Sequence, residues 1–212
     1  MRALLCRQYG LPDTLTVEEV ARLVPGRGEL VVDVKAASVN FPDVLMIQNK
    51  YQHRPVLPYI PGYELAGTVQ QMGEGVTGFG IGDAGVAIVR SGAFGEQALV
   101  PADRFWRLPR DFDLKIAAAF PLAYGTSYHA LKDRGRLLPG ETLVVLGAAG
   151  GVGLAAVQIG KAMGARVIAC ASSDEKLATC KQHGADELIN YSTHGLREAI
   201  KALTADAGAD VV

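Results

Sequence analysis

The sequence lacks the features that mark secreted, membrane-bound or nucleic-acid-binding chains. Its three cysteines, Cys6, Cys170 and Cys180, lie far apart without C-x-x-C spacing, so we expect neither a disulfide framework nor a cysteine zinc cage. No apolar run reaches membrane-spanning length, and the first residues become polar too soon for a signal peptide. The 21 basic and 22 acidic residues nearly cancel, so neither nucleic acid nor a membrane is an expected partner. These absences favour a cytoplasmic protein with reduced thiols.

What is present is an apolar content of 49% in 212 residues, enough for one large or two ordinary domains. Residues 1–124 alternate short β-rich runs with Gly and Pro turn signals, which predicts a small all-β barrel or sandwich. Residues 111–136 change to a helical period that is interrupted near Pro121, and we place the join between two domains there. The expected strands are Arg2–Cys6, Glu29–Ala37, Leu65–Gln71, Asp83–Val89 and Phe94–Val100.

Residues 125–212 alternate strand and helix patterns, which predicts an α/β domain with a parallel sheet. A sheet of this kind usually has about six strands, whereas the sequence reaches only the start of a fourth, at residues 210–212. We therefore expect the domain to be incomplete and the chain to be a fragment. The expected strands are Thr142–Leu146, Arg166–Ala171 and Glu187–Asn190; the expected helices are Gly153–Met163, Asp174–His183 with Ser173 as N-cap, and Leu196–Ala202.

The segment 142–161 reads TLVVLGAAGGVGLAAVQIGK, an apolar strand, a glycine turn and an apolar helix. This order is the context that a dinucleotide site requires, since the helix start offers free N–H groups to a pyrophosphate. Ala148 stands where the G-x-G-x-x-G pattern has its first glycine, and the alternative is a glycine turn that merely packs tightly. The predicted cofactor-binding residues here are Ala149, Gly150, Gly151, Val152 and Gly153.

The end of the second strand favours NADPH over NADH. An NAD site places an acid there to bind the ribose hydroxyls, but this sequence has Ala171. Ser172, Ser173 and Lys176 follow and can serve a 2′-phosphate, although Lys176 could equally be a solvated helix residue. Asp174 lies beyond the strand, where an acid at a helix start is common anyway.

Several segments together resemble the medium-chain dehydrogenase/reductase superfamily, and within it the quinone oxidoreductase or zeta-crystallin family. They include AASVNFPDVLMIQNKY, PYIPGYELAGTV, GAFGEQALVPAD and HGADELINY, in the expected order and across essentially the whole chain. The resemblance implies a GroES-like catalytic domain over residues 1–124. It also implies the first part of a Rossmann NADPH-binding domain over residues 125–212. The family's C-terminal portion is absent here, and a homodimer is expected for the complete protein.

The resemblance also assigns roles to residues. The zinc enzymes of the superfamily carry a cysteine near the segment SVNFPDV and a histidine in P-G-H-E, whereas this chain has no cysteine there and Tyr63 in place of the histidine. We therefore expect no metal site. Asn40 is the predicted catalytic residue that donates to a substrate carbonyl or holds the nicotinamide ribose; alternatively it forms an Asx-type turn before Pro42. Tyr51 is predicted to line the quinone pocket or to anchor its loop.

The remaining residues implied by the resemblance are Thr126, near the nicotinamide side of the cofactor, and Tyr191, beside the adenine ribose phosphate. Leu45 stands where many relatives have tyrosine, which makes the substrate pocket more apolar. The resulting hypothesis is a zinc-independent NADPH-dependent oxidoreductase that transfers hydride to a quinone or another conjugated carbonyl. The alternatives are an enoyl or 2-alkenal reductase of the same superfamily, and a non-catalytic NADPH-binding protein like the crystallin relatives, some of which also bind RNA. The balanced charge gives RNA binding no support.

Overall fold

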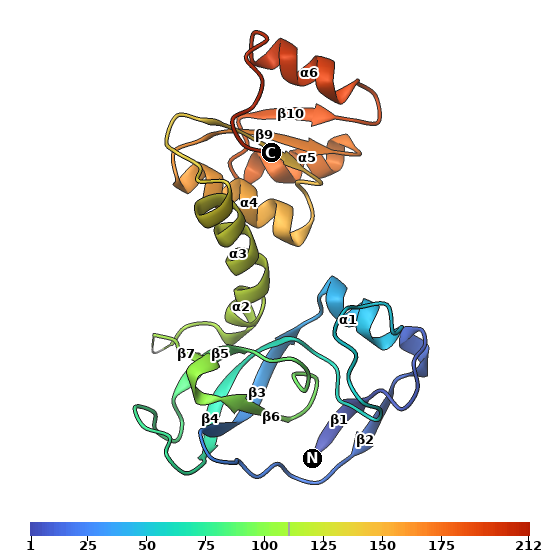
Figure 1. Ribbon diagram of the computed structural model, residues 1–212, viewed down its shortest axis with the longest axis vertical. Helices are drawn as coiled ribbons and strands as arrows, with labels where there is room; N and C mark the ends of the chain where they lie inside the picture. The colour runs from blue at the N-terminus through green and yellow to red at the C-terminus, as the bar shows by residue number, and fades with distance from the viewer. Residues whose placement is uncertain (110) are drawn as a thin grey trace. The chain divides into compact units, whose positions relative to one another are not determined.

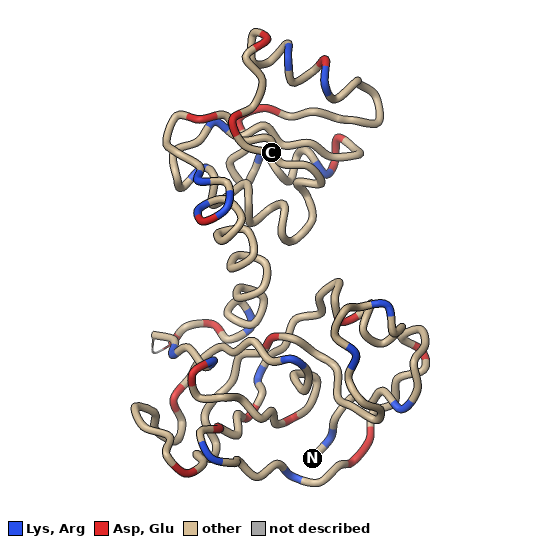
Figure 2. The backbone as a smooth tube through the Cα atoms, in the orientation of Figure 1, with Lys and Arg blue, Asp and Glu red and all other residues tan. Residues whose placement is uncertain are grey.

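The computed structural model describes residues 1–109 and 111–212, which divide into two compact units, Met1–Leu122 and Ala123–Val212 (Figure 1). The division lies close to the boundary expected after residue 124. Basic and acidic residues are interspersed along both units, and the formal net charge is −1 (Figure 2). No helix in the described ranges is long and apolar enough to span a membrane.

The first unit is built on an antiparallel sheet with the strand order β6-β3-β4-β5-β7 among its described residues. Its core lies on this sheet, where Leu30, Val32, Leu65 and Val69 are almost fully buried. Two further strands, β1 (Arg2–Leu5) and β2 (Thr16–Glu19), pair with each other, and Ala3 of β1 also forms an antiparallel bridge to Gly95. The sheet strands are β3 (Glu29–Ser38), β4 (Glu64–Met72), β5 (Ala84–Ile88), β6 (Gln97–Pro101) and β7 (Phe105–Arg107).

Helices of the first unit lie in its connections, and α1 (Phe41–Ile47) was not predicted from the sequence. It follows the end of β3, with Asn40 as N-cap and Pro42 in its first turn, where a missing N–H costs nothing. The expected strand from Phe94 begins only at Gln97, and the short strands β2 and β7 were also missed. The other helical segments are η1 (Pro12–Thr14), η2 (Ala102–Arg104) and α2 (Leu114–Ala118).

The second unit has a parallel sheet of order β10-β9-β8, whose strands have the predicted bounds. Val211 adds one parallel bridge to Leu143 of β8, on the side opposite β9, in place of the expected fourth strand. The core side chains that hold α4 on the sheet include Leu143, Val157 and Val167. The strands are β8 (Thr142–Leu146), β9 (Arg166–Ala171) and β10 (Glu187–Asn190).

Helices alternate with these strands, which confirms the α/β pattern predicted for this part. α4 starts at Gly151, two residues before the expected start at Gly153. α5 starts after Ser173, whose side chain accepts the Lys176 N–H as the N-cap prediction requires. The helical segments are α3 (Pro121–Tyr128), the π-helix η3 (His129–Arg134), α4 (Gly151–Ala162), α5 (Asp174–Gln182) and α6 (Leu196–Leu203).

Candidate functional site

In the first unit, one buried carboxylate gathers the polar groups at the ends of β3 and β4. Glu64 is 1% exposed. Its Oε1 accepts hydrogen bonds from the Ser38 hydroxyl and from Asn40 Nδ2, the latter at 2.9 Å, and its Oε2 accepts the Leu122 N–H at 2.7 Å. Asn40 Nδ2 also donates to Ser38 Oγ at 2.9 Å. The predicted residue Asn40 is therefore held in a closed network with Ser38 and Glu64.

A second carboxylate, Asp43, lies beside this network in the first turn of α1. Its Oδ2 accepts the Asn40 N–H at 2.8 Å, while Oδ1 is buried without a hydrogen-bond partner among the described residues. Burial raises the pKa of Asp43, and the nearby charge of Glu64 raises it further, although the N–H groups of Asn40 and Gly62 oppose the shift. The two carboxylates thus share one buried region, which is costly without a cation.

Tyr51, the other predicted catalytic residue, lies near Tyr63, the residue that precedes Glu64 in the chain. Burial raises the pKa of Tyr63, and Tyr51 adds to this shift while Arg90 opposes it. No hydrogen bond joins Tyr51 to Asn40 in the part of the chain that the structure describes. The structure therefore places Tyr51 with Tyr63 and Arg90.

In the second unit, the glycine turn holds the start of α4 against β8. A Cβ atom on Gly153 would lie 2.5 Å from the Gly147 carbonyl oxygen, so only glycine allows this close approach. A Cβ atom on Gly151 would meet nothing within 4 Å, so the backbone is open at the helix start. Gly150 is the N-cap and provides no side-chain cap. The N–H groups of the first turn are therefore available to an anion.

α3 contacts the same helix start. The buried Ser127 hydroxyl donates to the Val152 carbonyl oxygen at 2.7 Å, which fixes the exposed Thr126 beside the glycine turn. A cavity of about 610 Å³ lies here, lined by apolar side chains, Ser127 and the turn's glycines. The open backbone, the free helix start and the adjoining cavity fit the phosphates and an attached ring of a dinucleotide.

The predicted 2′-phosphate residues come together at the carboxyl ends of β9 and β10. The Lys176 ammonium group donates to Ser172 Oγ at 3.1 Å, and the Lys176 N–H donates to Ser173 Oγ at 3.4 Å. The Tyr191 N–H donates to the Ala171 carbonyl oxygen at 3.1 Å, and its side chain is 44% exposed. Three hydroxyl groups and one ammonium group therefore surround the buried end of β9.

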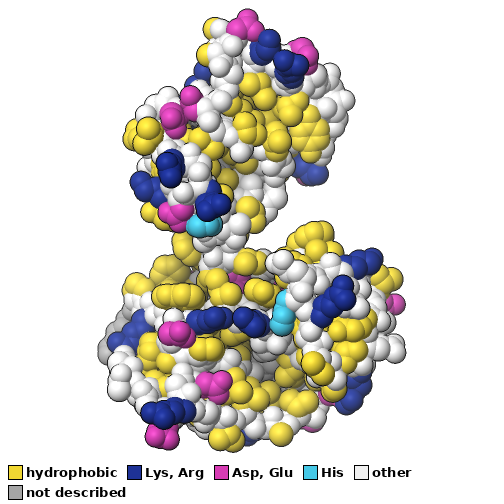
Figure 3. Space-filling model, viewed as in Figure 1, with side chains coloured by type: hydrophobic (Ala, Val, Ile, Leu, Met, Phe, Trp, Pro, Cys, Tyr) yellow, Lys and Arg dark blue, Asp and Glu magenta, His cyan; other side chains and the backbone are white. Residues whose placement is uncertain are grey.

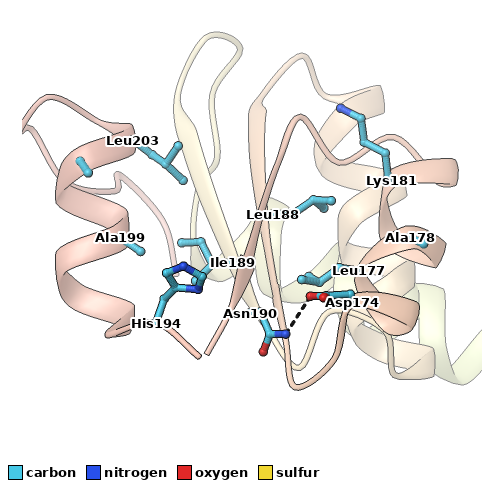
Figure 4. A pocket seen from close by; sticks show the side chains of 11 residues that line it. Asp174, Leu177, Ala178, Lys181, Leu188, Ile189, Asn190, His194, Ala199 and Leu203 are labelled. Atoms are coloured by element: carbon cyan, nitrogen blue, oxygen red, sulfur yellow. Dashed lines mark hydrogen bonds between the residues drawn. The ribbon is translucent and has the colours of Figure 1, made fainter. Parts of the chain in front are cut away.

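Two hydrogen bonds connect the loops that follow β9 and β10. Asn190 Nδ2 donates to Asp174 Oδ1 at 2.8 Å (Figure 4). The Ser192 hydroxyl donates to the Ser172 carbonyl oxygen at 2.9 Å. The Asn190 contact draws the Asp174 carboxylate toward β10. Sequence reasoning missed both Asn190 and Ser192, although each is a polar residue at or just after a strand end.

Beside the same loops, an apolar groove of about 620 Å³ follows β10 between α5 and α6. Leu188 points toward α5 and Ile189 toward α6, with Asp174, Asn190 and His194 at one end (Figure 4). Apolar side chains are also exposed elsewhere on both units (Figure 3), among them Val39 and Phe41 of the first and Leu146 and Val152 of the second. In the described residues, no three His, Cys, Asp or Glu side chains form a group that could hold a metal ion.

Comparisons with known proteins identify similar sequences and folds. The model of the alcohol dehydrogenase GroES-like domain matches residues 26–110, and that of the zinc-binding dehydrogenase matches residues 151–212. The mouse (Mus musculus) quinone oxidoreductase-like protein 2 is 39% identical over 99% of this chain. A probable oxidoreductase from Mycobacterium abscessus is 38% identical with a TM-score of 0.93, and covers 100% of this chain and 68% of its own. The Escherichia coli quinone oxidoreductase complexed with NADPH is 32% identical with a TM-score of 0.92, over 97% of this chain and 63% of its own.

The chain belongs to the quinone oxidoreductase family of medium-chain dehydrogenases/reductases. Membership confirms the predicted GroES-like domain followed by an incomplete Rossmann domain. The chain spans 60% of the length of the mouse relative, which agrees with the short parallel sheet of the second unit.

For this member of the quinone oxidoreductase family, the structure groups the predicted site residues by unit. In the first unit, Asn40 is hydrogen-bonded to Glu64, and Tyr51 lies near Tyr63, the residue that precedes Glu64. In the second unit the residues fall into two groups, one at the glycine turn and one at the end of β9. Ser38 was missed, although its position two residues before Asn40 at a strand end was a usable signal, since side chains at i and i+2 share a face.

Proposed function

We propose that the protein is a zinc-independent, NADPH-dependent oxidoreductase that transfers hydride to a quinone or another conjugated carbonyl. The observation that carries the choice of cofactor is the Lys176–Ser172 pair at the end of β9, where Ala171 stands in place of an acid. A 2′-phosphate carries close to two negative charges and is held best by an ammonium group and hydroxyl donors. NADH has no such group.

The start of α4 supports the pyrophosphate part of the cofactor. The open backbone at Gly151 and the N-cap Gly150, which provides no side-chain cap, leave the first turn accessible, and the helix dipole favours negative charge there. When bound, NADPH supplies the hydride, which with a proton from solvent reduces a quinone to a hydroquinone. The chain's own residues bind and orient the cofactor.

Asp174 is two residues before Lys176, and its carboxylate is a hydrogen-bond acceptor for Asn190. At the first position of α5 it also stabilises the helix dipole. Both contacts give the carboxylate a structural role, so Ser172 and Lys176 remain the groups that select the cofactor. The proposal of zinc independence rests on the segment SVNFPDV, which contains no cysteine, and on Tyr63, a phenol where the zinc enzymes have a histidine ligand.

The decisive experiment compares NADPH and NADH binding by calorimetry for the parent and for Lys176→Ala. One partly exposed charged hydrogen bond is worth about 1.4 kcal/mol, or a factor of ten in affinity. We expect Lys176→Ala to weaken NADPH about tenfold and to leave NADH unchanged. Lys181→Ala is the matched control, because Lys181 is on the same helix but donates to the Asp186 carbonyl oxygen at 3.0 Å. Equal affinity of the parent for both cofactors, or an equal loss for both in Lys176→Ala, would refute the assignment.

Substrate class needs a separate test by turnover of the complete protein on quinones and on 2-alkenals. The names of the mouse and Escherichia coli relatives support quinones as substrates. We expect NADPH oxidation that depends on the quinone and on no added metal. Turnover of 2-alkenals alone would favour the enoyl reductase alternative, and NADPH binding without any turnover would favour the non-catalytic one.

A further inference from the structure

β10 is the outermost strand of the parallel sheet in the described residues, and its free edge lies in the apolar groove between α5 and α6. The Asp186 N–H is donated inward to the Val167 carbonyl oxygen at 2.9 Å, so alternation along the strand turns the backbone groups of Glu187 and Ile189 outward. Leu188, between them, is 37% exposed. An edge that offers backbone N–H and C=O groups beside apolar side chains is a template for another strand.

The two ends of this groove carry opposite charges (Figure 4). Lys181 lies at the end where β10 begins, since its ammonium group donates to the Asp186 carbonyl oxygen at 3.0 Å. Asp174 lies at the other end, where it accepts from Asn190 Nδ2 at 2.8 Å. Their positions in α5 separate the two exposed charges by about 10 Å along the helix. Leu188 is midway between Asp186 and Asn190, so it marks the centre of the groove.

A two-fold axis through Leu188, perpendicular to the sheet, makes this surface its own complement. The axis pairs β10 with a second β10 in antiparallel orientation, with Glu187 of one copy opposite Ile189 of the other. It keeps α5 on the same face of the sheet and reverses its direction. Lys181 of each copy then lies against Asp174 of the other, and the apolar side chains of both grooves meet around the axis.

We propose that the free edge of β10 is an isologous interface on which a second copy of this chain docks, joining the two parallel sheets into one continuous sheet. The occupant is a second copy because the groove is self-complementary in charge as well as apolar. Three small side chains in the groove allow the helices of the two copies to approach closely, namely Ala178, Ala199 and Ala202. The inference concerns the second unit alone and does not depend on the proposed cofactor or substrate.

Charge reversal in the complete protein tests the pairing. Lys181→Glu places two carboxylates together at each end of the interface, and Asp174→Lys places two ammonium groups together there. We expect each variant alone to associate about tenfold more weakly than the parent at low salt, measured by sedimentation velocity. An equimolar mixture of the two variants should restore association, because each end then pairs a carboxylate with an ammonium group. Mixing would not repair a folding defect.

Glu175→Lys is the matched control for these variants. Glu175 is exposed on the same helix but does not line the groove, so its reversal should leave association within twofold of the parent.

Leu188→Cys locates the axis. Residues opposite each other at a non-hydrogen-bonded position of an antiparallel pair have Cα atoms about 4.5 Å apart, a distance that a disulfide spans. We expect diamide to convert this variant into a covalent dimer. The parent should stay unlinked, since Cys6, Cys170 and Cys180 are buried. Glu175→Cys, outside the groove, should not link either.

A monomeric parent, unchanged association in Lys181→Glu, or no recovery on mixing the two charge variants would overturn the inference. So would a Leu188→Cys protein that forms no disulfide, and a maleimide then shows what occupies the edge. A blocked thiol would mean that another segment of the complete chain or a different partner covers the groove, and a reactive thiol would mean that the edge is free.

Discussion

The candidate sites of the two units consist of different chemical groups. In the first unit the site depends on buried side chains, with Glu64 and Asp43 at 1% and 3% exposure, joined to partners from three separate elements. In the second unit it depends on backbone N–H groups at the start of α4 and on exposed side chains such as Lys176 and Tyr191. The antiparallel sheet holds polar groups inside, whereas the parallel sheet presents them at its carboxyl edge.

This difference predicts how mutations act. A buried hydrogen-bonded group contributes to stability as well as to binding, since its loss leaves partners unsatisfied. An exposed side chain at a strand end contributes chiefly to affinity. We therefore expect site mutations in the first unit to lower the free energy of unfolding, and those at the end of β9 to change only cofactor binding.

The largest effect is expected for Glu64→Ala, which leaves three buried donors without an acceptor and should lower the free energy of unfolding by about 4 kcal/mol. Thiol labelling can localise the loss. Cys6 lies in the first unit and Cys170 and Cys180 in the second, and all three are fully buried. Burial raises the pKa of each thiol, that of Cys170 to about 11, so labelling at pH 8 requires local opening.

We expect Glu64→Ala to accelerate labelling of Cys6 and to leave Cys170 and Cys180 unchanged. Glu96→Ala is the control, because this exposed carboxylate of the same unit pairs with the exposed Arg2 and should have a far smaller effect. Equal acceleration at all three cysteines would show that the two units do not open separately, and the expected difference between their responses to mutation would be wrong.

Gly153→Ala should have an intermediate effect, in the other unit. The new Cβ atom would lie 2.5 Å from the Gly147 carbonyl oxygen, so α4 must move away from β8 at a cost of about 2–3 kcal/mol. Labelling should accelerate at Cys170 and Cys180 and not at Cys6.

Gly151→Ala provides the matched change two residues earlier. Its Cβ atom would meet nothing within 4 Å, so stability should stay within about 0.5 kcal/mol of the parent. NADPH binding should weaken, since the added methyl group lies on the open side of the turn. A stability loss in Gly151→Ala as large as in Gly153→Ala would contradict the packing role assigned to Gly153.

The sequence predicts the second unit better than the first because its signals are local. The strands Thr142–Leu146, Arg166–Ala171 and Glu187–Asn190 each have apolar residues at their centre and lie between helical patterns, and the structure has these bounds. In the first unit, α1 was missed because seven residues that contain Pro42 resemble a turn, and the three-residue strand β7 is too short for any period.

The candidate sites divide in the same way. The glycine turn and the serines after β9 are contiguous in the chain, so a motif reveals them. The network around Glu64 joins residues that are 24, 26 and 58 positions apart, and no local pattern predicts which donors will reach one carboxylate. Resemblance identified Asn40, but the direction of its amide follows only from the tertiary contacts.

The smallest effect concerns the pH dependence of the first unit. The pKa of Asp43 is raised by burial, so the native state binds a proton more readily than the unfolded state does. Stability then falls as pH rises from the ordinary pKa of an aspartate carboxyl through the raised native pKa, because the charged form must be buried. Asp43→Asn removes this titration, and any fixed cost of the new amide N–H is the same at every pH. The stability of the variant relative to the parent should therefore be higher at pH 7 than at pH 3.

Urea denaturation followed by the fluorescence of Trp106, the chain's single tryptophan and a residue of the first unit, measures this difference. A difference that is constant with pH would show that the native state does not shift the pKa of Asp43, and one that favours the variant more at pH 3 would show that it lowers this pKa; either result would contradict the cost assigned to burying the charged form.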